Sequence, residues 1–558
     1  MSRLTGAHLI MRSLKLEGIR RIFTLVGDTI LPICDAAVDE GIELVDTRHE
    51  GAAMSMADAW CRITGEPAVA IVTGGPGFAN ALSALPHIYS AESPVIFIAG
   101  SGPLPEMGMY SFQEVDQVAM AAPSTKGSWL VHEKRRIPSF MAAAFRTAMS
   151  GRPGPVHLTI PIDIQEQEVS AEDLLSYGPS EYRHHGNTQG DQALIKDAID
   201  LLRNAQRPVV VTGNPARYSI APRQLREFAE TTGLPVFTVE QARGLLDDEH
   251  PLCFGYGDPG LNYAARHFRE ADAVLLLGKR LDHSYRYGRS PFFRADAKII
   301  QVDPTEVEIG RNRAITLGIV GDLGRVVDQL TEEAATSTWN DISSWREQLH
   351  KTRQSWRETL EANATDDLPL HPMKVMKEME QFIDDDAFII IDGGDFVHWG
   401  RSYLKARRPG RWLRLASLGH LGCGLPFALS AKLADPTARV FLFIGDGSLG
   451  FYLMEFDTAI RHNLPFTTVL GNDSAWGIDK GFQLAYFGRS VGTDLRNVRY
   501  DQVVQALGGH GEYVEKGEDV APAVQRAIDS QKPSLVNIVI KSIASPMAQA
   551  MIDNKTSK

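Results

Sequence analysis

The chain has 558 residues, of which 44% are hydrophobic and 23% charged, as in ordinary water-soluble globular proteins. At roughly 150 residues per domain, this length predicts three or four domains. The net charge of −12 argues against nucleic acid or an anionic membrane as the main partner. No apolar run is long enough to span a bilayer, and the N-terminus lacks the apolar core of a signal peptide. Because the four cysteines are far apart, we expect no disulfide framework, and we expect a cytoplasmic multidomain protein.

Short apolar runs alternate with longer amphipathic stretches along the chain, which predicts an α/β protein with three doubly wound parallel sheets. The runs are almost continuously apolar, as expected for strands covered by helices on both faces. In the first block an amphipathic helix comes first, and the predicted strands are Arg21–Leu25, Ile42–Val45, Ala68–Thr73, Pro94–Ala99 and Val156–Ile160. A polar stretch near Ser170–Gly190 resembles a linker.

The second and third blocks follow the same alternation. The second has predicted strands at Pro208–Thr212, Pro235–Thr238, Ala273–Leu277 and Lys298–Val302, with a helix near Leu323–Ala334. A charged stretch, Ser337–Asp367, is expected to be an exposed helical connector. The third has predicted strands at Ala387–Asp392, Val440–Ile444, Phe466–Leu470 and Ser534–Val539. The similar size and layout of the first and third blocks hint at one fold used twice.

The most informative segment is Ile444–Gly477, in which an apolar strand ends in Gly-Asp-Gly-Ser and a second strand ends in Gly-Asn-Asp. In a parallel sheet both strand ends lie at the carboxyl edge, so Asp446 and Asp473 can lie side by side. Two carboxylates beside a helix N-terminus suit a Mg²⁺ ion that bridges a diphosphate. Gly447 lets the backbone approach the phosphate, and Ser448 can bond it. Glycine and aspartate at strand ends also occur as plain turn formers.

This segment resembles the diphosphate-binding signature of thiamine diphosphate (ThDP) enzymes, a GDG followed after nearly thirty residues by an Asn pair. Glu455, Pro465 and Gly477 fit intermediate positions of that signature. The family's second metal ligand is usually Asn, whereas here the register falls on Asp473, which can still bind Mg²⁺. The third protein ligand implied by the resemblance is the backbone carbonyl of Ala475.

The resemblance also implies a glutamate in the first block that bonds N1′ of the cofactor's aminopyrimidine. Glu50 follows a predicted strand and begins a predicted helix. A buried carboxyl at this place promotes the imino tautomer, which removes the proton from thiazolium C2. Taken alone, Glu50 is a first-turn acid that interacts with the helix dipole. The surrounding pattern and the Thr-Gly-Gly-Pro-Gly-Phe-Ala-Asn run at 73–80 favour the catalytic role.

Two glycine-rich segments of the third block, Asp392–Trp399 and Ser417–Gly424, complete the resemblance. In related enzymes the first lies along the diphosphate, and the second places an apolar side chain, here Leu421, beneath the cofactor. The carbonyl of Gly419 would accept the 4′-amino hydrogen bond. The residues implied to bind the cofactor are Gly27, Asp28, Thr73, Pro76, Asn80, Gly393, Gly394, Gly419, Leu421, Gly445, Gly447, Ser448, Trp476, Gly477 and Ile478.

The resemblance runs from Thr5 to about Val539. It implies a pyrimidine-binding domain (1–172), a middle domain (190–335), a diphosphate-binding domain (368–546) and a tail (547–558). Acetolactate synthase, benzaldehyde lyase, oxalyl-CoA decarboxylase and 2-hydroxyacyl-CoA lyase share this order, and the chain is most similar in appearance to benzaldehyde lyase. We therefore expect a ThDP- and Mg²⁺-dependent carbon–carbon lyase or carboligase that acts on 2-hydroxyketones and aldehydes. The alternatives are a 2-hydroxyacyl-CoA lyase, an oxalyl-CoA-decarboxylase-like enzyme and an acetolactate-synthase-like carboligase that decarboxylates a 2-keto acid.

Departures from these relatives bear on the substrate. Gln113 would hold a substrate oxygen or an ordered water, or it is an exposed loop amide. Benzaldehyde lyase has a pocket histidine where this sequence has Thr29, and His398 stands where an apolar pocket residue is expected. We expect His398 or Asp28 to take over the handling of the proton, although a histidine there can also be structural. The predicted catalytic set is therefore Glu50, Gln113, Thr29 and His398.

The middle block binds FAD in acetolactate synthases and an adenine nucleotide in oxalyl-CoA decarboxylases, and the sequence supports neither ligand here. A basic loop at Gly278–Arg289 can receive the phosphates of a CoA-type group, or it is a solvated charged loop. Because Glu50 and Asp446 lie on different domains and the family's site forms between subunits, we expect at least a homodimer. We expect the complete assembly to be a homotetramer. A regulatory nucleotide-binding protein without catalysis and a Rossmann dehydrogenase are the rival classes.

Overall fold

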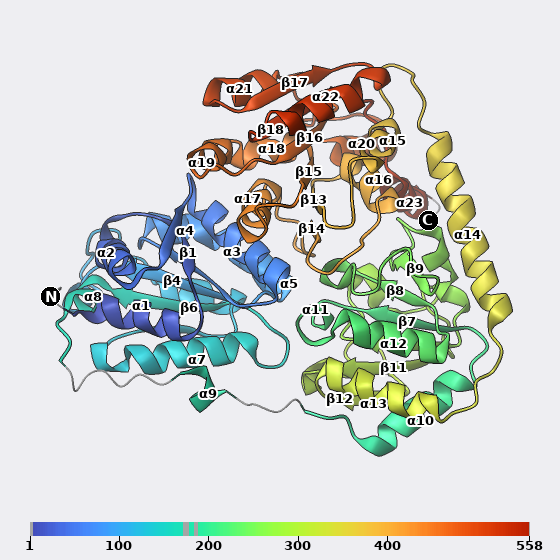
Figure 1. The fold of residues 1–558 in the computed structure, drawn as a ribbon, viewed down its shortest axis with the longest axis horizontal. Coiled ribbons are helices and arrows are strands. Elements are labelled where there is room, and N and C mark those ends of the chain that lie inside the picture. Colours follow the sequence, from blue (N-terminus) through green and yellow to red (C-terminus); the bar gives the residue numbers. More distant parts are fainter. Residues whose placement is uncertain (1–3, 171–177, 184–187, 557–558) are drawn as a thin grey trace. The chain divides into compact units, whose positions relative to one another are not determined.

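A computed structural model describes residues 4–170, 178–183 and 188–556. The remaining parts of the expected linker, the expected domain boundary at 172 and the end of the expected tail lie outside these residues. Contacts divide the chain into two compact units. The first unit comprises Met1–Gly186, Leu415–Ala434 and Tyr452–Leu464, and the second comprises Asn187–Arg414, Asp435–Phe451 and Pro465–Lys558. Figure 1 labels the elements of both.

The first unit contains a six-stranded sheet whose strand pairs are all parallel. In spatial order its strands are β2 (Glu43–Asp46), β1 (Arg21–Leu25), β3 (Ala68–Val72), β4 (Val95–Ser101), β6 (Val156–Pro161) and β5 (Ser128–Leu130). The larger helices of this part of the chain are α1 (Gly6–Leu16), α2 (Leu31–Glu40), α3 (Glu50–Thr64), α4 (Pro76–Leu82), α5 (Leu85–Ala91) and α7 (Ile137–Met149).

The second unit contains two further six-stranded parallel sheets. The middle sheet runs β12 (Leu317–Val320), β11 (Lys298–Asp303), β10 (Ala273–Leu277), β7 (Pro208–Thr212), β8 (Val236–Thr238) and β9 (Cys253–Tyr256). The third sheet runs β14 (Trp412–Arg414), β13 (Phe388–Asp392), β15 (Val440–Gly445), β16 (Thr467–Asn472), β18 (Ser534–Val539) and β17 (His510–Val514). The predicted fold class, three doubly wound parallel sheets, is confirmed.

Helices alternate with these strands along the chain. Those of the middle part are α10 (Gln192–Arg203), α12 (Pro222–Thr232) and α13 (Leu323–Ala335), and the expected connector forms α14 (Ser343–Ala362). Those that follow are α15 (Pro372–Glu380), α16 (Asp395–Tyr403), α17 (Gly424–Ala434), α18 (Asp446–Tyr452), α19 (Glu455–Arg461), α20 (Gly477–Phe487), α21 (Tyr500–Leu507), α22 (Gly517–Asp529) and α23 (Pro546–Thr556). None of the helices in the described residues is long and apolar enough to cross a membrane.

The first and third sheets have the same strand order when the strands are numbered within each sheet, which supports one fold used twice. In both, the chain reverses its direction of winding between the first and third strands in sequence, β1 and β3 in one and β13 and β15 in the other. Such switch points at the carboxyl ends of strands are where open α/β sheets bind ligands. Both predicted halves of the cofactor site therefore begin at a switch point.

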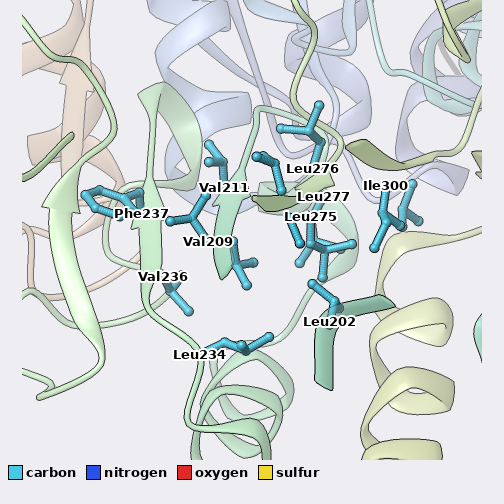
Figure 2. Packing of buried hydrophobic residues seen from close by; sticks show 14 of the residues in the cluster. Leu202, Val209, Val211, Leu234, Val236, Phe237, Leu275, Leu276, Leu277 and Ile300 are labelled. Carbon is cyan, nitrogen blue, oxygen red and sulfur yellow. The ribbon is translucent and has the colours of Figure 1, made fainter. Parts of the chain in front are cut away.

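Apolar side chains fill the core of the middle sheet. β7 and β10 are fully buried, as expected for central strands covered on both faces. Figure 2 shows Val209 and Val211 of β7 beside Leu275–Leu277 of β10, with Phe237 of β8 and Ile300 of β11 on either side. The packing fixes the strand ends that carry the loops discussed below.

One helix joins parts of the chain that are distant in sequence. α17 follows β14 in the chain, yet it belongs to the first unit and packs along α3. The Ser430 hydroxyl donates to the carbonyl of Met56 at 2.8 Å, and the guanidinium of Arg62 lies 5.0 Å from the ring of Phe427. The face of α3 that packs against α17 is therefore covered only when this later segment of the chain is present.

Candidate active site

Glu50 is the first residue of α3 and is 6% exposed. The helix begins there because the His49 side chain accepts the N–H of Gly51 at 3.0 Å, which caps the first turn. The side-chain amide of Asn80, on α4, donates to Glu50 Oε2 at 3.0 Å. The structure thus brings together the predicted acid and one predicted cofactor-binding residue in a buried place where a carboxyl can exchange a proton with a bound base.

The turn between β3 and α4 depends on glycine. A Cβ added to Gly77 would lie 2.6 Å from Thr73 Cγ2 and 3.2 Å from Glu50 Oε1. Gly75 has a φ of 57°, and a Cβ there would lie 2.4 Å from the carbonyl oxygen of Gln113. Pro76 fits at the start of α4, where no backbone N–H is needed. These glycines therefore allow Glu50 and Gln113 to approach the turn.

Thr29 and Thr73 lie at the two strand ends of the switch point and contact each other. Their hydroxyls are 2.9 Å apart, and the Thr29 hydroxyl also accepts the N–H of Gly74 at 2.8 Å. Thr29 is 5% exposed, whereas its neighbour Asp28 is exposed. The Thr29 hydroxyl thus holds the β1 and β3 ends together.

Gln113 lines a cavity of about 260 Å³ beside this turn, together with Gly102, Ser111 and Thr159. Its φ is 60°, and its side-chain carbonyl oxygen is buried without a hydrogen-bond partner among the described residues. A left-handed backbone at a non-glycine residue is strained, and an unpaired buried acceptor costs free energy. Both observations fit a residue that is held ready for a donor on a ligand or a water.

In the second unit, Asp446 follows β15 and Asp473 follows β16, so the two carboxylates meet at the edge of the third sheet. Asp446 is 2% exposed, and its Oδ2 has no hydrogen-bond partner among the described residues. Burial and the facing Asp473 raise the pKa of Asp446 to about 8, and burial raises the pKa of Asp473 as well. Two buried carboxylates in contact need a cation to stay ionised together.

Asn472 does not face Asp446. Its side-chain amide donates to Asn537 Oδ1 at 3.1 Å and its oxygen accepts the N–H of Ser474 at 3.2 Å, so it holds the loop. Two backbone hydrogen bonds form the β-bridge between Ala475 and Asp494: the Trp476 N–H donates to the Thr493 carbonyl, and the Leu495 N–H donates to the Ser474 carbonyl. The Ala475 carbonyl takes part in neither of them.

Glycines shape the surroundings of the two carboxylates. A Cβ on Gly477 would lie 2.6 Å from Asp473 Oδ2, and one on Gly447 would lie 2.7 Å from the Trp476 ring. By contrast, a Cβ on Gly445 would meet nothing within 4 Å, so space is open beside the strand end. Two facing buried carboxylates, a carboxylate oxygen without a hydrogen-bond partner in the described residues and open space at the backbone together fit Mg²⁺ and a diphosphate.

The remaining predicted residues of this half lie around the same strand ends. Gly393 has a φ of 126°, and a Cβ on it would lie 3.2 Å from the Ser448 hydroxyl. A Cβ on Gly394 would lie 3.1 Å from Ile478, so both glycines let the chain pass close to neighbours. Gly419 and Leu421 belong to the first unit: Gly419 has a φ of 74° with open space beside it, and Leu421 is half-buried.

His398 is buried on α16 and bonds the C-terminal part of the chain. Its Nδ1 lies 3.1 Å from the Ser545 hydroxyl, and that hydroxyl donates to Asp395 Oδ1 at 2.7 Å. Burial, together with Arg401 and Arg414, holds the pKa of His398 well below its usual range, so the ring is neutral near pH 7. The Ser542 hydroxyl also donates to Asp473 Oδ2 at 2.9 Å.

Two cations of the basic loop of the middle domain, Lys279 and Arg280, are paired with neighbouring carboxylates. Lys279 Nζ lies 2.7 Å from Asp282, and Arg280 forms two 3.0 Å hydrogen bonds to Glu308. The cations at the start of the loop therefore already have carboxylate partners.

Three residues that contact the site, Gln117, Ser542 and Ser545, were not singled out from the sequence. Gln117 accepts the N–H of Gly75 at 3.1 Å and donates to the carbonyl of Gly100 at 3.0 Å, which fixes the turn before α4. Ser542 and Ser545 reach the site from the C-terminal segment. Of the three, only Gln117 lies close in sequence to a predicted site residue, Gln113; the serines carry no local pattern.

Comparison with known proteins gives the same picture. Three models of thiamine pyrophosphate enzymes match: the N-terminal TPP binding domain at 4–120, the central domain at 195–330 and the C-terminal TPP binding domain at 392–538. The chain is 34% identical to the acetolactate synthase large subunit IlvG of Mycobacterium tuberculosis over 97% of both chains. It is 32% identical to 2-hydroxyacyl-CoA lyase 2 of Homo sapiens over 96% of this chain and 90% of that one. A probable acetolactate synthase large subunit of Methanocaldococcus jannaschii is 30% identical, over 96% of this chain and 92% of that one. The chain therefore belongs to the thiamine pyrophosphate enzymes and catalyses the formation or cleavage of a carbon–carbon bond.

Proposed function

We propose that this enzyme uses ThDP and Mg²⁺ to cleave or form the carbon–carbon bond of small 2-hydroxyketones, with an aldehyde as the second product or substrate. Bound ThDP would supply a nucleophilic carbon and take up the electron pair of the breaking bond. The buried Glu50, oriented by Asn80, is suited to hold and return a proton at the aminopyrimidine. Asp446, Asp473 and the Ala475 carbonyl would hold Mg²⁺.

The observation that carries the choice of a small substrate is the pairing of the basic loop. A CoA thioester brings several phosphate charges, which need cations that are available to them. Lys279 and Arg280 are occupied by Asp282 and Glu308. Binding of CoA phosphates to these two cations would require both ion pairs to break, whereas a small hydroxyketone makes no such demand.

A second candidate is decarboxylation of a 2-keto acid followed by carboligation. It is supported by the acetolactate synthase large subunit that matches this chain over 97% of its length. Gln113, with its unpaired buried oxygen, can bind an acceptor or a water in either reaction.

We also propose that the active enzyme is at least a homodimer, and a homotetramer in full. In a single chain, Met109, Tyr110 and Phe112 are 71%, 100% and 74% exposed on the loop that precedes and includes Gln113. Exposed apolar residues gathered on one loop indicate a covered surface in the assembly. Light scattering on the purified protein gives the mass of the assembly, and a stable monomer with full activity would contradict this proposal.

The deciding experiment uses the purified protein with saturating ThDP and Mg²⁺. Benzoin cleavage is followed by the benzaldehyde released, CO₂ release is measured from pyruvate, and aldehyde release is measured from a 2-hydroxyacyl-CoA. We expect benzoin to give the highest kcat/KM. Faster CO₂ release from pyruvate would establish the second candidate, and faster cleavage of the thioester would contradict both. The E50Q variant serves as the catalytically silent control in all three assays.

A further inference from the structure

A cavity of about 500 Å³ lies in the second unit between the connector helix α14, strand β9 and the C-terminal end of α16. None of its lining residues is among those predicted for ThDP or Mg²⁺. Its apolar walls are formed by Phe254, Trp356, Leu360 and Leu404, and five basic side chains also line it. A cavity of this size and mixed lining is typical of a small-molecule site.

Three arginines surround the ring of Tyr256 at the inner end of this cavity region. Arg243 and Arg401 lie over the ring, with guanidinium carbons 5.2 and 4.8 Å from its centre. Arg414 lies 3.3 Å from the Tyr256 hydroxyl, and Arg401 donates to the same hydroxyl at 2.8 Å. All three are held in a part of the protein with little access to water.

Only two of these arginines have a carboxylate partner. Arg243 pairs with Asp248, and Arg414 pairs with Glu240 at 2.6 Å. No carboxylate of the described residues lies within 4 Å of Arg401, although its side chain is only 4% exposed and its Nε has no hydrogen-bond partner there. Glu240 and Asp258 are close enough to act electrostatically on Arg401, but neither forms an ion pair with it.

Arg353 is a second cation that forms no direct ion pair in the described chain, although Glu249 is close enough to act on it. It lies on α14, donates to the carbonyl of Cys253 at 2.5 Å and packs over Phe254. The acidic groups of the lining are mostly paired: Asp248 with Arg243, Glu249 with Lys405 and Glu361 with Arg357. Glu358, at the exposed rim, accepts a hydrogen bond from Gln354.

The neighbouring histidines report the same positive surroundings. Burial and the charges of Arg353 and Arg346 lower the pKa of His350, which also lines the cavity. Burial and the charges of Arg401 and Arg414 lower the pKa of His398. The buried Nε of Arg401 has no hydrogen-bond partner among the described residues, and a charged oxygen of a bound anion would satisfy it.

We infer that this cavity binds a small organic anion whose phosphate or carboxylate group pairs with Arg401 and Arg353. The hydrocarbon part of the ligand lies against the apolar walls. The planar guanidinium of arginine favours such groups because it can bond two of their oxygens at once. The ligand class is thus an aryl or alkyl phosphate or carboxylate of moderate size.

The test is titration calorimetry on the full enzyme saturated with ThDP and Mg²⁺, so that the diphosphate site is already filled. The probes are inorganic phosphate, phenyl phosphate and benzoate. We expect one phenyl phosphate to bind per chain, more tightly than inorganic phosphate because of the apolar walls. Binding of benzoate with a similar affinity would show that the site accepts carboxylates as well as phosphates. If benzoate does not bind, the site accepts phosphates only.

The variants R401Q and R353Q should each weaken phenyl phosphate binding by about tenfold or more, the loss of a charge-assisted pair. K351Q is the matched control, because Lys351 lies on the same helix, pairs with Glu347 and is outside the lining. R353Q decides the matter if R401Q does not fold, since Arg353 is only partly buried. The proposal is overturned if phenyl phosphate does not bind, or if it binds R353Q as tightly as K351Q.

Discussion

Glu455 accepts the backbone N–H of Arg48 through both carboxylate oxygens, at 3.1 and 3.2 Å. The Thr458 hydroxyl donates to the same carboxylate at 2.5 Å, and burial raises the pKa of Glu455 to about 7. Glu455 begins α19, whereas Arg48 lies in the loop two residues before Glu50. A residue of the late chain thus fixes the loop that carries the predicted acid.

Replacement of Glu455 should therefore misplace Glu50 without removing it. We expect E455A to lower kcat by about tenfold or more, since it removes both acceptors of the Arg48 N–H and leaves that donor of the loop without its partner. E455Q keeps one acceptor oxygen and should recover part of the loss. E518A, at an exposed glutamate in the first turn of α22, is the control, and steady-state kinetics compare the three. Equal activity of E455A and E518A would show that the contact does not position the loop.

Removal of the acid itself should separate binding from turnover. E50Q keeps the shape of the side chain and its contact with Asn80, so ThDP affinity should change little. Because the proton can no longer be exchanged, kcat should fall by about 10²–10⁴-fold. Quenching of intrinsic fluorescence on ThDP addition measures the affinity. Full turnover by E50Q would refute the assignment of Glu50.

The open space at Gly445 gives a test of the diphosphate site. G445A adds a methyl group that meets nothing within 4 Å of the chain, so the ligand-free protein should keep its melting temperature. The same methyl group would occupy the place proposed for the diphosphate, and ThDP affinity should fall by about tenfold or more. G450A is the matched control, because its Cβ also meets nothing within 4 Å. Equal ThDP affinity in the two variants would place the diphosphate elsewhere.

The facing carboxylates of Asp446 and Asp473 predict that loss of one charge stabilises the metal-free protein but reduces its stabilisation by Mg²⁺. D473N removes the like charge opposite Asp446, so the metal-free protein should melt at a higher temperature. The rise in melting temperature on addition of Mg²⁺ should shrink, because one oxygen ligand is weaker. Differential scanning calorimetry with and without Mg²⁺ measures both. An undiminished response of D473N to Mg²⁺ would exclude Asp473 as a ligand.

A buried histidine sets part of the acid sensitivity. Burial lowers the pKa of His157 from 6.5 to about 3 in the folded protein. Between these values the unfolded chain binds one more proton, so the stability that His157 contributes is complete above about pH 6.5 and is lost as pH falls toward 3. Between about pH 6.5 and pH 3, the free energy of unfolding of H157Q should fall by up to about 5 kcal/mol less than that of the unmodified protein. Urea unfolding at several pH values, with H132Q as an exposed control, measures the difference.

The sequence predicted the central strands far better than the edges. Arg21–Leu25, Pro208–Thr212, Ala273–Leu277 and Ser534–Val539 are strands with the bounds expected for them. The strands that were not predicted, β5, β9, β12, β14 and β17, all lie at an edge of a sheet. An edge strand is paired on one side and less buried, so its residues need not form an apolar run.

The candidate site shows a similar division. Asp446 and Asp473, which lie within one motif, could be paired because strand ends in a parallel sheet meet at one edge. Contacts between residues that are far apart in the sequence could not be predicted in this way. Ser545 bonds Asp395 across 150 residues of chain, and no periodicity or spacing records that approach.

The packing of α17 on α3 limits how the protein can be divided for study. A fragment that stops before the middle sheet would keep β1, β3 and Glu50 but would lose the helix that carries Ser430 and Phe427. The side of α3 against which they pack would then face water, and such uncovered apolar surface favours aggregation. A soluble N-terminal fragment would therefore need residues 415–434 and 452–464 grafted back onto it. The first compact unit is thus assembled from separate parts of the chain, whereas the three sheets are consecutive in sequence.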